Sequence, residues 1–248
     1  DREASEGCVL VKVADGFGAI IALKCETDFV AQNADFIKLT QDILDAAVAN
    51  KCKTLEEVKA LPMGDATIAQ AVTDRSGITG EKMELDGYMT LEGPVIATYN
   101  HQNKNFLCTM VVLNKVVDAK VGHEIAMQVA AMNPKYLSSA DVSDEYKEKE
   151  KEVLLAQAKN DPKNAGKPNE IIEKMIIGRL NKELKEVCLT EQLYVKAENK
   201  ESVAKYVDMV AKENGCNITL KQFVRFETGE GLEKKNEDFA AEVASQLK

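Results

Sequence analysis

GCVLVKVADGFGAIIALKC, residues 7–25, decides the fold of the first part of the chain. Residues 7–14 are apolar and rich in β-branched side chains, Asp15-Gly16 is a turn pair, and residues 18–25 repeat the apolar pattern. An Asp-Gly pair between two such runs indicates a hairpin, because both residues tolerate the positive φ angles that a two-residue turn requires. The sequence therefore predicts an antiparallel hairpin over residues 7–25.

Helical and strand patterns follow this hairpin in blocks. Helices are predicted from Asn33 onward, over 54–61, over 66–75 with the glycines Gly77 and Gly80 as its end, over 122–132, 143–160 and 168–187, over 202–213, and as a closing helix over 237–248. Strands are predicted over 83–91, 95–101, 106–113 and 216–226, with a loop over 227–235. Strands in clusters, with helices between and after them, indicate the α+β class with small antiparallel sheets.

A weak internal sequence repeat indicates that one structural unit is duplicated in the chain. The segments Asn33-Ala-Asp-Phe36 and Asn236-Glu-Asp-Phe239 each follow a strand and a Glu-Thr pair, and each opens an amphipathic helix. We therefore expect two related subdomains, residues 1–115 and 116–248, each a small antiparallel sheet packed with helices. The two long helices over about 143–187 are expected to form an antiparallel helical hairpin inserted in the second subdomain, because the connection between them is short.

Charge and composition narrow the classes of partner. The 248 residues carry 32 Lys and Arg against 41 Asp and Glu, a net charge of −9, and the lysines are interleaved with glutamates. Such a chain repels phosphate backbones and anionic lipid. Aromatic residues make up 5% and Trp is absent, too few for a stacking platform for single-stranded nucleic acid. We expect no direct nucleic-acid partner and no membrane partner.

The six cysteines lie far apart and form no Cys-x-x-Cys motif. In a chain of this size they indicate reduced thiols, so a cytoplasmic location is expected and zinc ligation is not. No apolar run approaches the roughly 20 residues that a bilayer-crossing helix needs. The first residue is Asp rather than Met, and we expect the chain to be a processed or truncated piece.

Patterns typical of catalysis are weak throughout. Only two histidines exist, His101 and His123, so a multi-histidine metal site cannot be assembled. Cys25 or Cys108 could form a dyad with His101, but cysteines buried in strands are the better interpretation. The sequence has no phosphate-binding loop, and the segment 229–231 (Gly-Glu-Gly) is interpreted as a turn, because its acidic side chain would oppose a phosphate. We expect neither an enzyme, nor a cofactor, nor a metal.

One segment is different: Cys25-Glu26-Thr27-Asp28-Phe29-Val30 places a large ring beside a carboxylate, after a strand and before a helix. From the residues alone, the favoured interpretation is that Phe29 packs under the following helix, because most loop phenylalanines are anchored. The alternative is an exposed wedge of an aromatic ring and an acid, a combination that can dominate a protein interface.

The segment Thr27-Asp28-Phe29-Val30-Ala31 closely resembles the signature of the bacterial translation elongation factor Ts family, the guanine-nucleotide exchange factors of elongation factor Tu. The resemblance extends in order along the chain to the C-terminus. It includes Gly80-Glu81, residues 91–93, 99–101, 125–131, 166–168, 225–227, 229–231 and 238–244. Ordered agreement at so many points makes the resemblance specific.

The resemblance implies a partner and a site. Thr27, Asp28, Phe29 and Val30 are expected to bind elongation factor Tu, in its GDP-bound and nucleotide-free states, with the Asp-Phe pair entering between helices near its Mg²⁺ site. Gly80 and His101 are expected to add contacts. The family's N-terminal helical domain has no counterpart in this sequence, so weaker binding is expected. The stretch 52–79 departs from the family pattern.

Two alternatives of other classes accompany this hypothesis. One is a structural or interaction dimer built on the helical hairpin, and a homodimer through this hairpin is also expected as a partner arrangement of the exchange factor, because its Ile/Leu stripe is wide. The other, much less favoured, is a hydrolase built on a Cys–His pair.

Overall fold

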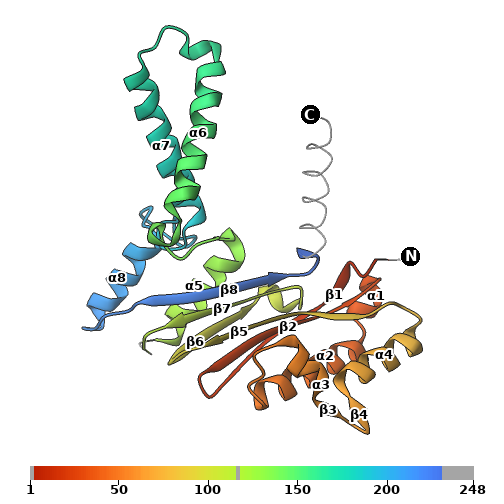
Figure 1. The fold of residues 1–248 in the computed structure, drawn as a ribbon. Helices are drawn as coiled ribbons and strands as arrows, with labels where there is room; N and C mark the ends of the chain where they lie inside the picture. Colours follow the sequence, from red (N-terminus) through yellow and green to blue (C-terminus); the bar gives the residue numbers. More distant parts are fainter. Residues whose placement is uncertain (1–2, 116–117, 231–248) are drawn as a thin grey trace. The chain divides into compact units, whose positions relative to one another are not determined.

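The computed structural model describes residues 3–115 and 118–230 (Figure 1). In chain order its elements are β1 Glu6–Ala14, β2 Phe17–Cys25, α1 Asp28–Ala31, α2 Ala34–Ala49, α3 Leu55–Ala60, β3 Pro62–Met63, β4 Ala66–Thr67, α4 Ile68–Thr79, β5 Glu84–Glu92, β6 Val95–Asn100, η1 His101–Asn103, β7 Leu107–Leu113, α5 Ala119–Met132, η2 Ser139–Asp141, α6 Asp144–Asn160, η3 Pro162–Asn164, α7 Asn169–Val187, α8 Val203–Glu213 and β8 Leu220–Glu227. Small sheets with antiparallel pairing pack against helices, so the predicted α+β class is confirmed.

The described residues form two compact units. The first holds the chain up to Ala130 together with the part from Lys221 on, and the second holds Ala131–Leu220. The predicted division near residue 115 separates two subdomains that are expected to be structurally related. This relation stays a prediction. The closing helix was expected over 237–248, and the second copy of the sequence repeat is at 236–239. Both lie outside the described residues.

The predicted hairpin is confirmed in the first sheet, whose strand order is β1-β2-β5. β1 and β2 pair antiparallel from Glu6↔Cys25 to Ala14↔Phe17. The two turn residues have positive φ angles, 52° at Asp15 and 73° at Gly16, as a two-residue hairpin turn requires. The Asp-Gly pair thus sets the register of the sheet that carries the candidate site.

The central strand β2 is buried on both faces, and all nine of its residues are inaccessible. One face packs with α2, which covers that side of the sheet (Figure 1). The residues in this contact are Phe17, Ala19, Ile21 and Leu23 of β2 and Phe36, Ile43, Leu44 and Ala47 of α2. The other face of β2 packs on the second sheet, through Ile20 and Ala22 against Cys108, Met110 and Phe226. The helix predicted from Asn33 is confirmed, and the Asn33 side chain caps it by accepting from the Asp35 amide at 2.9 Å.

The segment before β5 differs from the expected one. Pro62–Met63 and Ala66–Thr67 pair as two short strands, joined through Gly64 at a φ of 63°. The predicted helical start at Ala66 is therefore wrong, because Thr67 is the cap residue of α4 and its hydroxyl accepts from the Gln70 amide. The helix runs beyond the predicted residue 75 to Thr79, and it stops at Gly80, one of the two glycines predicted to end it, whose φ is 73°.

The second sheet has the order β6-β7-β8. The strands predicted over 95–101 and 106–113 are confirmed, with ends that differ by one residue. The last strand begins at Leu220 rather than at the predicted Cys216. Ile218 and Leu220 keep the apolar alternation that suggested the longer strand, and both are buried, but ladder pairing starts only at Leu220.

The second unit contains the predicted helical hairpin, with α6 and α7 side by side (Figure 1). Its seam is an apolar stripe of α7, made by Ile172, Ile176, Leu180 and Leu184 against Leu154 and Ala158 of α6. Glu145 and Lys149 of α6 form an ion pair at 3.1 Å, and Ser143 caps α6 by accepting from the Tyr146 amide. α8 follows as predicted, with Ser202 as its cap.

Candidate functional site

The residues singled out by the sequence lie directly after β2, where the chain forms the one-turn helix α1. We call residues 27–30 the tip. Thr27 caps this turn, because its hydroxyl accepts a hydrogen bond from the Val30 amide at 3.3 Å. The Thr27 carbonyl also accepts from the Cys25 thiol at 3.2 Å, which ties the tip back to the end of the strand.

Phe29 is exposed over 83% of its surface, more than any other large hydrophobic side chain in the described residues. The interpretation favoured by the residues alone, a ring packed under α2, is therefore wrong. The anchor is instead Val30, which is partly buried and packs against the core of the first sheet together with Ala31. Asp28 is exposed beside the ring. The turn thus presents an acid and an aromatic ring to solvent and keeps only aliphatic residues inside.

A single carboxylate from a distant part of the chain holds the start of the tip. Glu81 Oε1 accepts from the backbone amides of Glu26 at 3.1 Å and Thr27 at 2.9 Å, and Oε2 accepts from the Thr27 hydroxyl at 2.7 Å. The Glu26 side chain reaches in the opposite direction and accepts from the Lys82 amide at 3.1 Å. Two segments more than fifty residues apart are therefore joined by four hydrogen bonds, which we call the Glu81 clamp.

Gly80 is part of the same arrangement. It ends α4 in the left-handed conformation with its amide donating to the Ser76 carbonyl at 2.9 Å, and a Cβ at this position would meet open space. A φ near 73° carries no steric penalty for glycine but is strained for most other residues. Gly80 therefore sets the direction in which Glu81 leaves the helix. The structure thus brings Gly80 and the tip together, as two sides of one clamp.

Ile78 lies three residues before Glu81 and is exposed over 73% of its surface. It comes second after Phe29 among exposed large hydrophobic side chains of the described chain. Sequence reasoning missed both Ile78 and the role of Glu81. Glu81 was named only as part of the resemblance, and Ile78 falls in the stretch 52–79 that departs from the family pattern.

His101 belongs to a separate cluster in the first unit. Its Nδ1 lies 3.1 Å from the Tyr99 hydroxyl, and its ring meets the edge of Phe106 at 5.8 Å between centroids. The loop behind it is held by Asn100 and Asn105, whose side chains bond at 2.7 Å. The His101 ring contacts Tyr99 and Phe106, and neither residue belongs to the tip. The structure therefore fixes the ring of His101 locally without bringing it into the Glu81 clamp.

The cysteines suggested for a dyad do not face a histidine in the described part of the chain. The Cys25 thiol donates to the Thr27 carbonyl, and the Cys108 thiol donates to the Val9 carbonyl at 3.4 Å. Burial raises the pKa of each of these two thiols to about 12. A thiol with so high a pKa supplies almost no thiolate at neutral pH, so neither position has the chemistry of a nucleophile.

Metal ligation and membrane insertion find no support within residues 3–115 and 118–230. No three residues of the His, Cys, Asp and Glu types gather there in a way that could hold a metal ion. Among the same residues, none of the helices has the length and apolar character that a bilayer crossing demands.

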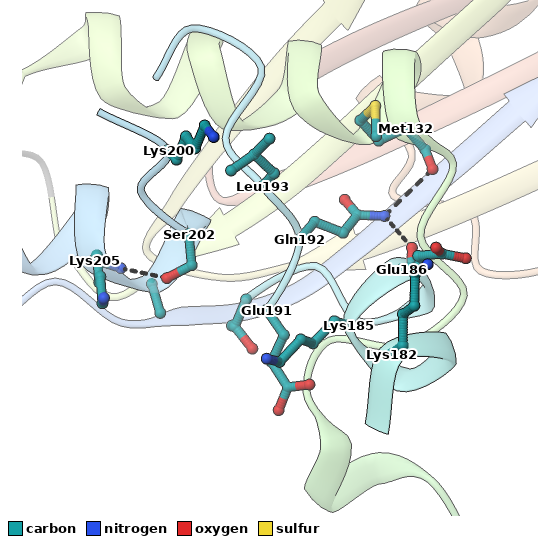
Figure 2. Close-up of a pocket in the computed structure, with 12 residues that line it drawn as sticks. Met132, Lys182, Lys185, Glu186, Glu191, Gln192, Leu193, Lys200, Ser202 and Lys205 are labelled. Carbon is teal, nitrogen blue, oxygen red and sulfur yellow. Dashed lines mark hydrogen bonds between the residues drawn. The ribbon is translucent and has the colours of Figure 1, made fainter. Parts of the chain in front are cut away.

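The second unit contains a cavity of about 810 Å³ (Figure 2). Its floor is Gln192, which is buried and donates from Nε2 to the carbonyls of Glu186 at 2.8 Å and Met132 at 3.3 Å. Its rim carries four lysines and two glutamates: Lys182, Lys185, Lys200, Lys205, Glu186 and Glu191. Mixed charges at a solvent-facing rim are typical of an ordinary surface hollow, so we assign this cavity no ligand.

Comparison with known proteins gives one consistent result. The family model described as Elongation factor TS matches residues 26–230, a range that includes the tip, Gly80 and His101. Elongation factor Ts of Bacteroides fragilis is 52% identical over 278 aligned positions, covering 91% of this chain and 83% of that protein. Elongation factor Ts of Clostridium botulinum is 41% identical over 254 positions, covering 99% and 82%. That of Bacteroides thetaiotaomicron is 65% identical over 159 positions, covering 64% and 48%.

Proposed function

Because this chain belongs to the elongation factor Ts family of translation elongation factors, we propose that it binds elongation factor Tu and promotes the release of GDP from it. The proposal covers Tu in both its GDP-bound and its nucleotide-free state. It assigns the chain no chemical step and no cofactor, since no bond is made or broken in exchange. It also places the protein in the cytoplasm, without a nucleic-acid or membrane partner.

The observation that carries the proposal is the exposed ring of Phe29 on a clamped turn. A phenylalanine that is 83% exposed contributes little to folding. The Glu81 carboxylate nevertheless accepts three hydrogen bonds from Glu26 and Thr27, and these bonds hold the backbone just before the ring. Exposed aromatic residues on rigid supports are typical of interface hot spots, which gain their energy when a partner buries them.

The mechanism we propose is linkage between the tip and the nucleotide. Tu holds GDP with its phosphate loop and a Mg²⁺ ion, which neutralises much of the phosphate charge. A wedge that fits only a distorted, Mg²⁺-poor site must weaken GDP binding, and GDP must weaken the wedge by the same factor. Couplings between sites are typically about 1–3 kcal/mol, or roughly 5–150-fold in affinity.

We propose a role for each residue of the tip, in line with the family resemblance. Phe29 fills a pocket between helices of Tu, and Asp28 disturbs the surroundings of the metal ion electrostatically. Thr27 and Val30 hold the tip, Thr27 as its cap and Val30 as its partly buried anchor. Gly80 lies beside them at the exposed end of α4.

Two further residues complete the proposed contact surface. His101 supplies a second, separate contact region, since Tyr99 and Phe106 hold its ring. To the predicted set we add Ile78, whose exposed side chain lies close in sequence to the Glu81 clamp. It is thus a candidate for a second apolar contact.

The test is the release of fluorescent mant-GDP from Tu, followed with and without this chain. We expect the chain to accelerate release in proportion to its concentration until the complex saturates. A chain that is fully folded by circular dichroism and leaves the release rate unchanged at saturating concentration would refute the proposal.

A second candidate function, self-association, is favoured by one observation on the helical hairpin. Val153 on α6 and Ile171 and Ile177 on α7 are each about half exposed, although they are aliphatic. We propose that a second copy of this chain covers them. Sedimentation velocity should show a dimer that dissociates when Ile171 and Ile177 are both changed to Lys, whereas a monomer at all concentrations would refute it.

A further inference from the structure

The Glu81 clamp is more extensive than the capping of a one-turn helix requires. Helices of one turn are unstable alone, because the cost of fixing the first residues exceeds the gain from so few hydrogen bonds. Capping of α1 is already supplied by the Thr27 hydroxyl. The Glu81 carboxylate adds bonds to two backbone amides and one hydroxyl before the helix begins. Its function must therefore concern the placement of the turn rather than its formation.

Glu81 is itself held firmly from the side of α4. Its carbonyl accepts from the Ser76 hydroxyl at 2.6 Å, and its amide donates to the Thr79 hydroxyl at 3.3 Å. The carboxylate consequently starts from a fixed backbone and has few rotamers to lose when it binds the tip. Hydrogen bonds to a charged acceptor are roughly twice as strong as neutral ones, so three of them form a stiff connection.

Phe29 has no comparable support of its own. Neither Asp28 nor Phe29 is buried, and Phe29 is not a member of the two core clusters described above for the faces of β2. Its direction depends on the backbone at residues 26 and 27, which the Glu81 clamp fixes, and on the anchor Val30. Without the carboxylate, the tip would remain attached at Val30 but would sample several directions.

We propose that Glu81 is a positioning residue, which pre-organises the tip so that Phe29 and Asp28 meet the partner in one conformation. This inference rests on the proposed function of the tip. Both carboxylate oxygens are engaged within the chain, so Glu81 acts through Phe29 rather than by binding the partner. Pre-organisation raises affinity because the ordering cost is met before binding, not during it.

The first measurement needs no partner. In Glu81→Ala both acceptor oxygens are removed, so the Glu26 and Thr27 amides lose Oε1 and the Thr27 hydroxyl loses Oε2. We expect hydrogen–deuterium exchange at the Glu26 and Thr27 amides to accelerate by about tenfold or more, with the rest of the first sheet unchanged. Unchanged protection of these two amides would overturn the clamp itself, whatever the chain does to Tu.

The second measurement is GDP release from Tu in a double-mutant cycle of Glu81→Ala and Phe29→Ala. Misplacement of a contact group by about 1 Å can cost up to about a hundredfold, so we expect Glu81→Ala to lower the efficiency of stimulated release by at least about tenfold. In the Phe29→Ala background the same change should have little further effect, because the ring it positions is gone. An equal loss in both backgrounds would show that Glu81 acts elsewhere, and no loss in either would overturn the inference.

A matched control and a second variant keep the test decisive. Glu56→Ala removes an exposed carboxylate of α3 that pairs with Lys59 at 3.8 Å, and it should leave release and amide exchange unchanged. If Glu81→Ala folds poorly, Glu81→Asp keeps the charge but is one methylene shorter, and it should show the same loss. A wild-type chain that fails to stimulate release at all would refute the proposed function. The amide-exchange result would still test whether Glu81 holds the Glu26 and Thr27 amides.

Discussion

The change Phe29→Ala separates an interface residue from a core residue, and its magnitude can be worked from the exposure of the ring. A phenylalanine offers about 150–250 Å² to burial. With 83% exposed, about a sixth of that area, roughly 30 Å², is lost from the fold when the ring is removed. At about 25 cal/mol per Å² this is worth at most about 0.8 kcal/mol. The better helix propensity of Ala in α1 offsets about half of it, so we expect a net change within about 0.5 kcal/mol.

The matched control is Phe36→Ala in α2. Phe36 is fully buried in the core of the first sheet, and its truncation should cost roughly 3–5 kcal/mol. In a chain of this length one kcal/mol corresponds to about 2–4 °C in melting temperature. Thermal melts should therefore place Phe29→Ala within about 2 °C of wild type and Phe36→Ala far below it.

Phe29→Ala should affect GDP release strongly although it affects stability little. Phe29→Ala should cost at least about 2 kcal/mol of coupling to Tu, the scale of an interface hot spot, which is roughly thirtyfold in stimulated GDP release. Asp28→Ala should act in the same direction but more mildly, because water can replace part of its effect. The two residues serve one site, so the double mutant should be non-additive. A large fall in the melting temperature of Phe29→Ala, with unchanged exchange per folded molecule, would refute the reasoning.

Four further predictions can be checked separately. The chain alone should bind neither GDP nor GTP, because it has no phosphate-cradling loop, and a micromolar nucleotide site in calorimetry would contradict this. Replacing 143–187 by a short Gly-Ser link should leave much of the exchange activity, whereas complete loss with an intact fold would count against the tip as the main contact. At about pH 8, iodoacetamide should label Cys216 readily and the five buried cysteines only after unfolding, which mass spectrometry would show. Burial and the neighbouring Glu150 charge raise the pKa of Glu183, so its ionised form is disfavoured in the folded hairpin. Glu183→Gln should therefore stabilise the chain by about a few tenths of a kcal/mol at neutral pH, a gain that vanishes as the pH falls through the pKa of Glu183.

Local patterns explain which elements were predictable. The hairpin over residues 7–25 was predicted to its turn, since Asp15-Gly16 determines both the turn and the register. The amphipathic helices were predicted for the same reason, because their apolar spacing and caps lie within a few residues of one another. The two-residue strands at 62–63 and 66–67 were missed, because so short a pairing leaves no periodicity.

The candidate site was only partly predictable. The tip residues were found, but the side chain that packs inside was misjudged from the residues alone: Val30 takes the anchoring place that was expected for Phe29. In a four-residue turn the neighbouring positions point in different directions, and apolar character does not tell which one faces the core. Glu81 could not be found by local reasoning, since its partners lie 54 and 55 residues away.

An exposed phenylalanine on a one-turn helix departs from the rule that large apolar side chains are buried, and it adds little to the stability of the fold. Such departures are typical of functional positions. Burial of the exposed part of Phe29, about 170 Å² on the same scale, offers about 4 kcal/mol to a partner. If residues 27–30 were disordered before binding, ordering their backbones would cost about 1–2 kcal/mol each. That cost would cancel the whole contribution of the ring. A single aromatic residue can therefore supply a coupling of about 1–3 kcal/mol only when the fold has ordered the tip in advance, and the Glu81 clamp is the feature of this chain that does so.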